Sequence, residues 1–198
     1  YANMFRSRMR SAPAPHTLAS LMKICIVSYS HDNRPLLAAP VRDARTAGAE
    51  SILHCGDVVA PSTLEVVKPY DIPIHVIHGN NTGDLYMMGR ISAQTSNLTT
   101  YYGQDAGLEL GGRRVFLVHY PHYAEAMATT GDWDLVCCGH DHKVDIRVIR
   151  NIKGGDTHFV NPGTVGGIKA PATWVLGDLE TMTFTVNEVR ADDSVASG

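Results

Sequence analysis

The sequence predicts an α/β fold, a four-layer αββα sandwich of two mixed β-sheets flanked by helices. In the first half of the chain, apolar runs alternate with segments of helical spacing, which is typical of a parallel sheet with right-handed crossovers. The second half holds mostly strand-like runs and opens with a hairpin signal at Gly111-Gly112. Two β-rich halves with outer helices amount to such a sandwich.

Strands and helices alternate in the first half. Continuous or alternating apolar residues predict the strands, while an early proline and a terminal glycine mark the helix ends. The expected elements are a strand at 23–28, a helix at 35–48, a strand at 51–55, a short helix at 61–67 and a strand at 72–78. Residues 85–100 are expected to form a helix with a mobile loop.

The second half is expected to be dominated by strands. Gly111-Gly112 separates the two strands of the first hairpin, and Glu180-Thr181 marks the turn of a closing hairpin. The expected elements are strands at 107–110 and 113–118, a helix at 121–130, and strands at 135–138, 144–149, 158–161, 173–178 and 182–189.

The length of 198 residues suits one domain, which we place at residues 22–190. Residues 1–21 carry three arginines and no acidic residue, so we interpret them as an N-terminal extension outside the fold, either a transit peptide or an upstream addition. Residues 191–198 are expected to be a C-terminal tail.

The composition of the chain excludes some classes of binding partner. A net charge of -3 argues against a broad surface for nucleic acid or anionic membranes, and no apolar run reaches the roughly 18 residues needed to cross a bilayer. The four cysteines, Cys25, Cys55, Cys137 and Cys138, lie in apolar stretches without Cys-x-x-Cys spacing, which predicts reduced, packed thiols. The cytoplasm is the expected location, and the sequence is compatible with a homo-oligomer.

Polar side chains with ligand chemistry recur wherever an apolar strand ends. The segments are Ser28-Tyr29-Ser30-His31, Gly56-Asp57, Gly79-Asn80-Asn81, Val118-His119 and Gly139-His140-Asp141-His142. Parallel strands bring such positions to one edge of a sheet. Imidazole, carboxylate and amide oxygen together suit Mn, Fe, Zn, Co or Ni better than Ca or Mg.

Each segment alone has an ordinary structural explanation. Gly-Asp after a strand often forms a turn or helix cap, and a strand-ending histidine such as His119 is usually just hydrogen-bonded. His140-x-His142 is more informative, because alternate residues leaving a strand project to the same side. The five segments together, in this order, make the metal-site interpretation stronger than the ordinary one.

With these motifs, the sequence resembles the calcineurin-like metallophosphoesterase superfamily, most closely its small bacterial and archaeal phosphodiesterase branch, which includes the retromer subunit of the same fold. The family pattern runs D-x-H, G-D, G-N, a strand-ending H, and G-H-x-H. A further family loop matches Asn161-Pro162-Gly163-Thr164. The resemblance covers about residues 22–189.

The resemblance implies a two-metal site. Asp57 would bridge the ions, one of which would also bind Asn80, His119 and His140, and the other His31 and His142. A metal-activated hydroxide would attack phosphorus in line. Asn81 lies where many relatives carry a phosphate-contacting histidine, so the resemblance implies a catalytic role for Asn81, weaker than that of a histidine.

Tyr29 departs from the family pattern because it stands in the slot of an aspartate ligand. A phenol has a pKa near 10 and binds a metal only after losing its proton. Relatives with a tyrosine ligand carry it three positions after G-D, which is Ala60 here, and we do not expect Asp32 to compensate. A weakened first site beside a retained second site is the expected result.

Two functions therefore compete. The first is a metal-dependent phosphoesterase, most simply a phosphodiesterase, that acts on a small phosphodiester or phosphomonoester with one or two divalent ions. The second is a catalytically impaired metal-binding scaffold for protein assembly, which Tyr29 favours and the six retained ligands disfavour. An engineered change at Tyr29 is a third explanation of that residue.

Overall fold

The computed structural model describes residues 22–94 and 98–189. The expected N-terminal extension, the C-terminal tail and residues 95–97 of the expected mobile loop lie outside the described residues. The elements are, in order, β1 (Lys23–Val27), α1 (Arg34–Thr46), β2 (Ala49–His54), the 3-10 helix η1 (Pro61–Tyr70), β3 (Ile74–Val76), α2 (Leu85–Gln94), β4 (Thr99–Tyr101), β5 (Asp105–Leu110), β6 (Arg113–Val118), α3 (Pro121–Thr129), β7 (Leu135–Cys137), β8 (Val144–Arg150), β9 (Asp156–Pro162), β10 (Thr173–Asp178) and β11 (Thr183–Glu188).

The first sheet has the strand order β11-β10-β1-β2-β3-β4. Strands β1 to β4 run parallel, as the alternation of strands and helices predicts, whereas β10 lies antiparallel to β1 and to β11. In the register, Val27 pairs with His54 and His54 pairs with Val76. The first three strands therefore end at the same level, and the loops that follow them meet at one edge.

The second sheet has the order β5-β6-β7-β9-β8. Strands β6, β7 and β9 run parallel in its centre, with β5 and β8 antiparallel at its edges. The predicted hairpin at Gly111-Gly112 joins β5 to β6, and both glycines have positive φ, of 54° and 73°. Both sheets are mixed, which confirms the predicted fold class.

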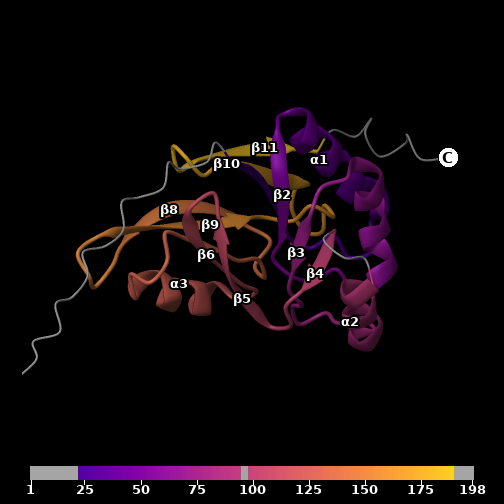
Figure 1. The fold of residues 1–198 in the computed structure, drawn as a ribbon, viewed down its shortest axis with the longest axis horizontal. Coiled ribbons are helices and arrows are strands. Elements are labelled where there is room, and N and C mark those ends of the chain that lie inside the picture. The colour runs from indigo at the N-terminus through magenta and orange to yellow at the C-terminus, as the bar shows by residue number, and fades with distance from the viewer. Residues whose placement is uncertain (1–21, 95–97, 190–198) are drawn as a thin grey trace, which may run out of the picture.

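Three apolar clusters separate the four layers. Alternate residues of β1 show this directly: Cys25 and Val27 pack beneath α1 and η1, whereas Ile24 and Ile26 pack between the two sheets. A third cluster, with Ala124 and Phe159, lies between the second sheet and α3. Figure 1 shows α1 and α2 beside the first sheet and α3 against the second.

The prediction for the cysteines is confirmed, because all four are free and buried. Cys137 packs between the sheets and Cys138 packs under α3, because adjacent strand residues face opposite sides. Within the described parts of the chain, no helix has the length and apolar character that a membrane span requires.

Two elements differ from the sequence expectation. The short helix after β2 is a 3-10 helix and runs further than predicted, to Tyr70. The segment expected as one helix with a loop contains α2 and also β4, a three-residue strand that pairs with β3 from Ile74 to Val76. Strand β4 exists because β3 offers it an open edge, which local sequence does not reveal.

Candidate metal centre

The carboxyl ends of five strands converge on one site. The loops after β1, β2 and β3 carry Tyr29, Asp57 and Asn80, while β6 and β7 of the other sheet deliver His119 and His140. Several of these residues adopt positive φ angles that non-glycine residues rarely adopt, namely Tyr29 (60°), His31 (40°), Asp57 (59°), His140 (75°) and His142 (61°). Strained backbone of this kind concentrates at functional sites.

The amide oxygen of Asn80 lies at the centre of one ligand cluster. Asn80 Oδ1 is 3.0 Å from His119 Nε2 and 2.9 Å from His140 Nδ1. Asp57 Oδ1 lies 3.5 Å from the same His119 Nε2. The four residues that were expected to hold the second ion are thus brought together.

The hydrogen bonds of His119 show which kind of ligand this cluster can bind. Its Nδ1 lies 2.8 Å from the carbonyl oxygen of Cys55, which only accepts, so Nδ1 carries the proton. Burial lowers the pKa of His119 and favours the neutral ring, which leaves a lone pair on Nε2. That lone pair faces the oxygens of Asn80 and Asp57, so electron-rich atoms with no proton between them point at one another.

A divalent cation would stabilise this arrangement. Among the described residues, no three His, Cys, Asp or Glu side chains are grouped so that they could hold an ion by themselves. Asn80 supplies the further oxygen, and an amide oxygen with imidazoles and a carboxylate is a donor set that suits Mn, Fe, Co, Ni or Zn. Asp57, Asn80, His119 and His140 therefore fit a transition-metal ion.

Asp57 is held rigidly beneath the site. It is fully buried, and its two oxygens accept hydrogen bonds from Asn81, at 2.9 Å from the backbone N–H and 2.6 Å from the side-chain amide. His31 Nε2 lies 3.5 Å from Asp57 Oδ2, so the carboxylate faces both predicted ion positions. The side chain of Asn81, predicted to contact substrate, donates to Asp57 and also lines the open cavity.

Tyr29 occupies the space between the remaining ligands. Its side chain is only 2 % exposed, and its ring centroid lies 5.0 Å from that of His31 and 3.8 Å from that of His142. The hydroxyl donates to the backbone oxygen of His140 at 2.5 Å. Burial, and then the negative charge of Asp57, raise the pKa of Tyr29 well above its ordinary value, so the residue is a neutral phenol.

The two histidines beside Tyr29 each have a ring nitrogen that could bind a metal ion. His142 Nδ1 donates to the carbonyl oxygen of Ile168 at 2.8 Å, which leaves Nε2 with its lone pair. His31 Nε2 is buried and finds no hydrogen-bond partner among the described residues. An orphaned buried nitrogen is uncommon, and this one has the chemistry of a metal ligand.

Asp32 takes no part in the centre. Its Oδ1 accepts hydrogen bonds from the backbone N–H of Ala60 at 2.7 Å and the hydroxyl of Thr63 at 2.8 Å, at the start of η1. The expectation that Asp32 does not replace the missing carboxylate agrees with this geometry.

Two supporting residues complete the scaffold of the site. Asn161, from the Asn-Pro-Gly-Thr loop, is buried and donates to the carbonyl oxygen of Gly139 at 2.8 Å and to Asp141 Oδ1 at 2.7 Å, which fixes the His140–His142 loop. His54 Nε2 lies 3.1 Å from the hydroxyl of Ser30. Burial lowers the pKa of His54 to about 3, so this ring is neutral. The sequence motif pointed to Asn161, but nothing in the sequence indicated the His54–Ser30 contact.

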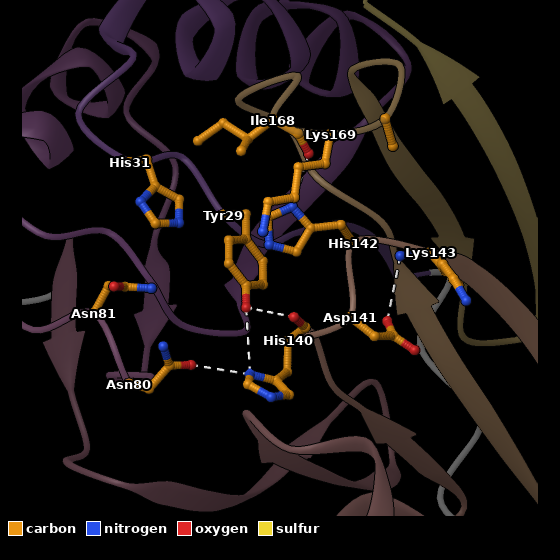
Figure 2. A pocket seen from close by; sticks show the side chains of 11 residues that line it. Tyr29, His31, Asn80, Asn81, His140, Asp141, His142, Lys143, Ile168 and Lys169 are labelled. Carbon is orange, nitrogen blue, oxygen red and sulfur yellow. Dashed lines mark hydrogen bonds between the residues drawn. The ribbon is translucent and has the colours of Figure 1, made fainter.

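A cavity of about 520 Å³ opens over the centre. Figure 2 shows that the side chains of Tyr29, His31, Asn80 and His140 face it, together with Lys169 from the loop after β9. Lys169 was not among the predicted site residues, because a single lysine in an irregular loop carries no sequence signal. The opening is a concave pocket of the size used by small ligands.

Gly79 is expected to be essential for the shape of the centre. A Cβ at this position would lie 2.1 Å from Asp57 Oδ1 and 2.6 Å from His119 Nε2. We therefore expect Gly79→Ala to displace both ligands, with an overpacking cost of about 1–3 kcal/mol in the free energy of unfolding and metal affinity at least ~10-fold lower. Titration calorimetry with Mn²⁺ and thermal unfolding measure the two effects.

Gly89→Ala is the matched control, because a Cβ at Gly89 meets nothing within 4 Å and the residue lies in α2. Alanine should stabilise the helix by about 1 kcal/mol and leave Mn²⁺ affinity unchanged. Equal metal affinity in Gly79→Ala and the natural chain would contradict the ligand geometry described above.

Comparison with known proteins places the same residues in a known fold. Residues 22–182 match the calcineurin-like phosphoesterase superfamily domain. A phosphodiesterase of Methanocaldococcus jannaschii, MJ0936, is 26% identical over 148 residues, which span 74% of this chain and 86% of that protein.

Solved structures agree with the fold. A structure described as a novel archaeal phosphodiesterase covers 85% of this chain and 100% of its own, with a TM-score of 0.77 at 21% identity. Vacuolar protein sorting 29 of Cryptosporidium parvum covers 85% of this chain and 97% of its own, with a TM-score of 0.53 at 18% identity. At these identities the likeness shows the fold alone.

Proposed function

Because this chain belongs to the calcineurin-like phosphoesterase superfamily, we propose that it is a phosphodiesterase that hydrolyses a small phosphodiester with one divalent transition-metal ion. The observation that carries the proposal is the cluster around Asn80 Oδ1, with His119 Nε2 at 3.0 Å and His140 Nδ1 at 2.9 Å. A relative named as a phosphodiesterase supports the diester substrate. A small phosphomonoester would fit the same chemistry.

Asp57, Asn80, His119 and His140 would hold the ion. When bound there, a divalent ion lowers the pKa of water and offsets negative charge on phosphoryl oxygens. The protein supplies orientation: Cys55 fixes the tautomer of His119, and Asn81 fixes both oxygens of Asp57. These bonds keep the ligands in place before substrate arrives, which reduces the reorganisation required during the reaction.

A single ion follows from the position of Tyr29. A metal–nitrogen or metal–oxygen bond is about 2.0–2.2 Å long, so an ion shared by His31, His142 and Asp57 needs the space between the two rings. The Tyr29 ring fills that space, 3.8 Å from the His142 ring centroid. Its hydroxyl is turned to the backbone of His140 and, as a neutral phenol, makes a poor ligand.

A metal-binding scaffold is the alternative, and two observations favour it. Tyr29 replaces a catalytic ligand, and the fold matches vacuolar protein sorting 29 at a TM-score of 0.53. Against it stands the open cavity of about 520 Å³ over the ion position. A metal-binding scaffold would share the ligand tautomer of His119, but it has no need of an open cavity above the ion, so we favour the enzyme.

The proposal predicts hydrolysis that depends on a metal ion. With Mn²⁺, the chain should release p-nitrophenol from bis-(p-nitrophenyl) phosphate, and chelation by EDTA should stop the reaction. His140→Ala should lower the rate at least ~100-fold, because it removes one of the four ligands and outer contacts alone are worth 10- to 100-fold. His122→Ala is the control, since His122 is an exposed histidine of α3 outside the cavity lining.

Absorbance of the released phenol measures the rate, and elemental analysis gives the metal content. One bound ion with no hydrolysis of diesters or monoesters, for any of Mn²⁺, Fe²⁺, Co²⁺, Ni²⁺ or Zn²⁺, would establish the scaffold instead.

A further inference from the structure

Lys169 lines the cavity but has no part in the proposed metal ligation. It lies in the loop after β9 and adopts a φ of 62°, which places a non-glycine residue in the left-handed region. It lines the same cavity as Tyr29, His31 and His142. Lysine is a flexible residue on most surfaces, so a lysine in a strained backbone conformation beside a reaction centre calls for an explanation.

The loop that carries Lys169 is tied to the blocked ion position. The carbonyl oxygen of Ile168 accepts the hydrogen bond of His142 Nδ1 at 2.8 Å, and the Gly166 N–H donates to the backbone oxygen of Tyr29 at 2.9 Å. A Cβ at Gly166 would lie 2.6 Å from that oxygen, so the loop packs closely on Tyr29. The backbone of Lys169 is therefore fixed relative to Tyr29 and His142.

The side chain of Lys169 extends into the cavity. Figure 2 shows it running from the loop toward the rings of His142 and Tyr29, whereas the side chain of Lys143 extends away from Tyr29. The Lys169 ammonium forms no hydrogen bond or ion pair with any residue in the described ranges 22–94 and 98–189. An unpaired cation that lines a cavity is available to an anionic ligand.

The charge of the site points to the same role. An aspartate together with a divalent ion contributes one net positive charge to a phosphoester site. The Tyr29 ring takes the place of that aspartate and fills the space of the ion, so a substrate phosphoryl group at this centre would meet one positive charge fewer. One ammonium restores the difference, and the Lys169 side chain runs toward the rings of Tyr29 and His142.

We propose that Lys169 substitutes for the first metal ion by binding a non-bridging phosphoryl oxygen of the substrate next to the Tyr29 ring. The inference rests on the proposed phosphodiesterase function. The ammonium keeps its protons throughout, and no covalent bond to it forms or breaks. Its contribution is a positive charge placed where charge on the phosphoryl oxygens must be offset.

Phosphate binding tests the proposal without relying on turnover. The full chain, loaded with Mn²⁺, is titrated with inorganic phosphate in a calorimeter. The Kd for phosphate should be roughly tenfold higher in Lys169→Gln than in the natural chain, as expected for a lost hydrogen bond to a charged group. Lys143 lines the same cavity, but its side chain extends away from Tyr29, so Lys143→Gln is the matched control and should bind phosphate as the natural chain does. Lys169→Arg should retain most of the affinity, because it keeps the charge.

A second comparison separates a specific role from general electrostatics. In a Tyr29→Asp background with two bound ions, the ion supplies the missing charge, so adding Lys169→Gln should change the phosphate Kd by less than twofold. Equal losses in both backgrounds, or equal losses in Lys143→Gln and Lys169→Gln, would overturn the proposal. Circular dichroism and the measured metal content show that the variants are folded and loaded.

The outcomes also keep the two proposals apart. Hydrolysis that is unchanged in Lys169→Gln, with phosphate binding unchanged, would leave the phosphodiesterase intact and remove the role of Lys169. If the chain hydrolyses no phosphoester but its phosphate binding depends on Lys169, the anion site is supported and the proposed phosphodiesterase function is wrong.

Discussion

Asp57→Asn is expected to abolish metal binding and to lower phosphodiesterase activity at least ~100-fold. The carboxylate is fully buried and lies 3.5 Å from a nitrogen of both His31 and His119. Asparagine removes its negative charge. It also places an amide nitrogen against Asn81, whose own N–H groups now donate to both oxygens. One donor must then remain unpaired in a buried site, which costs about 1–3 kcal/mol.

Asp84→Asn makes the same chemical change outside the centre. Asp84 is exposed and accepts the Met87 N–H at 2.8 Å, and asparagine serves equally well at such a helix start. Elemental analysis after dialysis against Mn²⁺, followed by rate measurement on an aryl phosphodiester, compares the two variants. Full activity in Asp57→Asn would show that the hydrolysis does not use this centre.

The position of the centre was predictable because parallel strands constrain it. Once β1, β2 and β3 are recognised as consecutive parallel strands, the residues after them must meet at one edge of the sheet. The same reasoning places His119 and His140 together, since β6 and β7 are also parallel neighbours. The sequence therefore predicts where strand-end polar residues lie, even though it does not predict their side-chain contacts.

The behaviour of Tyr29 was not predictable in the same way. Sequence shows that a carboxylate is replaced, but its side-chain direction depends on a backbone φ of 60° and on the surrounding rings. Both are products of tertiary packing. Our proposal that Tyr29 obstructs the ion position rests partly on its hydrogen bond to the backbone of His140, a residue far along the chain.

Strand β4 and Lys169 share a different reason for being missed. Strand β4 has three residues and depends on pairing with β3, so its own sequence carries little signal. Lys169 acquires its position from the contacts of its neighbours Gly166 and Ile168 with Tyr29 and His142. Non-local contacts of this kind have no local sequence pattern.

Tyr29→Asp is expected to raise the number of bound divalent ions from about one to two and to increase the hydrolysis rate on the order of 10²-fold. The substitution removes the ring between His31 and His142 and supplies the missing carboxylate. His31 Nε2, which finds no hydrogen-bond partner among the described residues, would then coordinate the ion. Tyr29→Phe is the matched control: it keeps the ring, so it should still bind one ion.

Stability gives an independent measurement of the same change. Without metal, a carboxylate at position 29 stands close to the buried Asp57 and the like charges repel, so Tyr29→Asp should melt below the natural chain. With Mn²⁺ at about 100 times the Kd, binding of the additional ion adds about 2.7 kcal/mol to the free energy of unfolding. The rise in Tm on adding Mn²⁺ should therefore be larger in Tyr29→Asp than in the natural chain or in Tyr29→Phe. Two ions in the natural chain, or an unchanged ion count in Tyr29→Asp, would show that the ring does not block the first position.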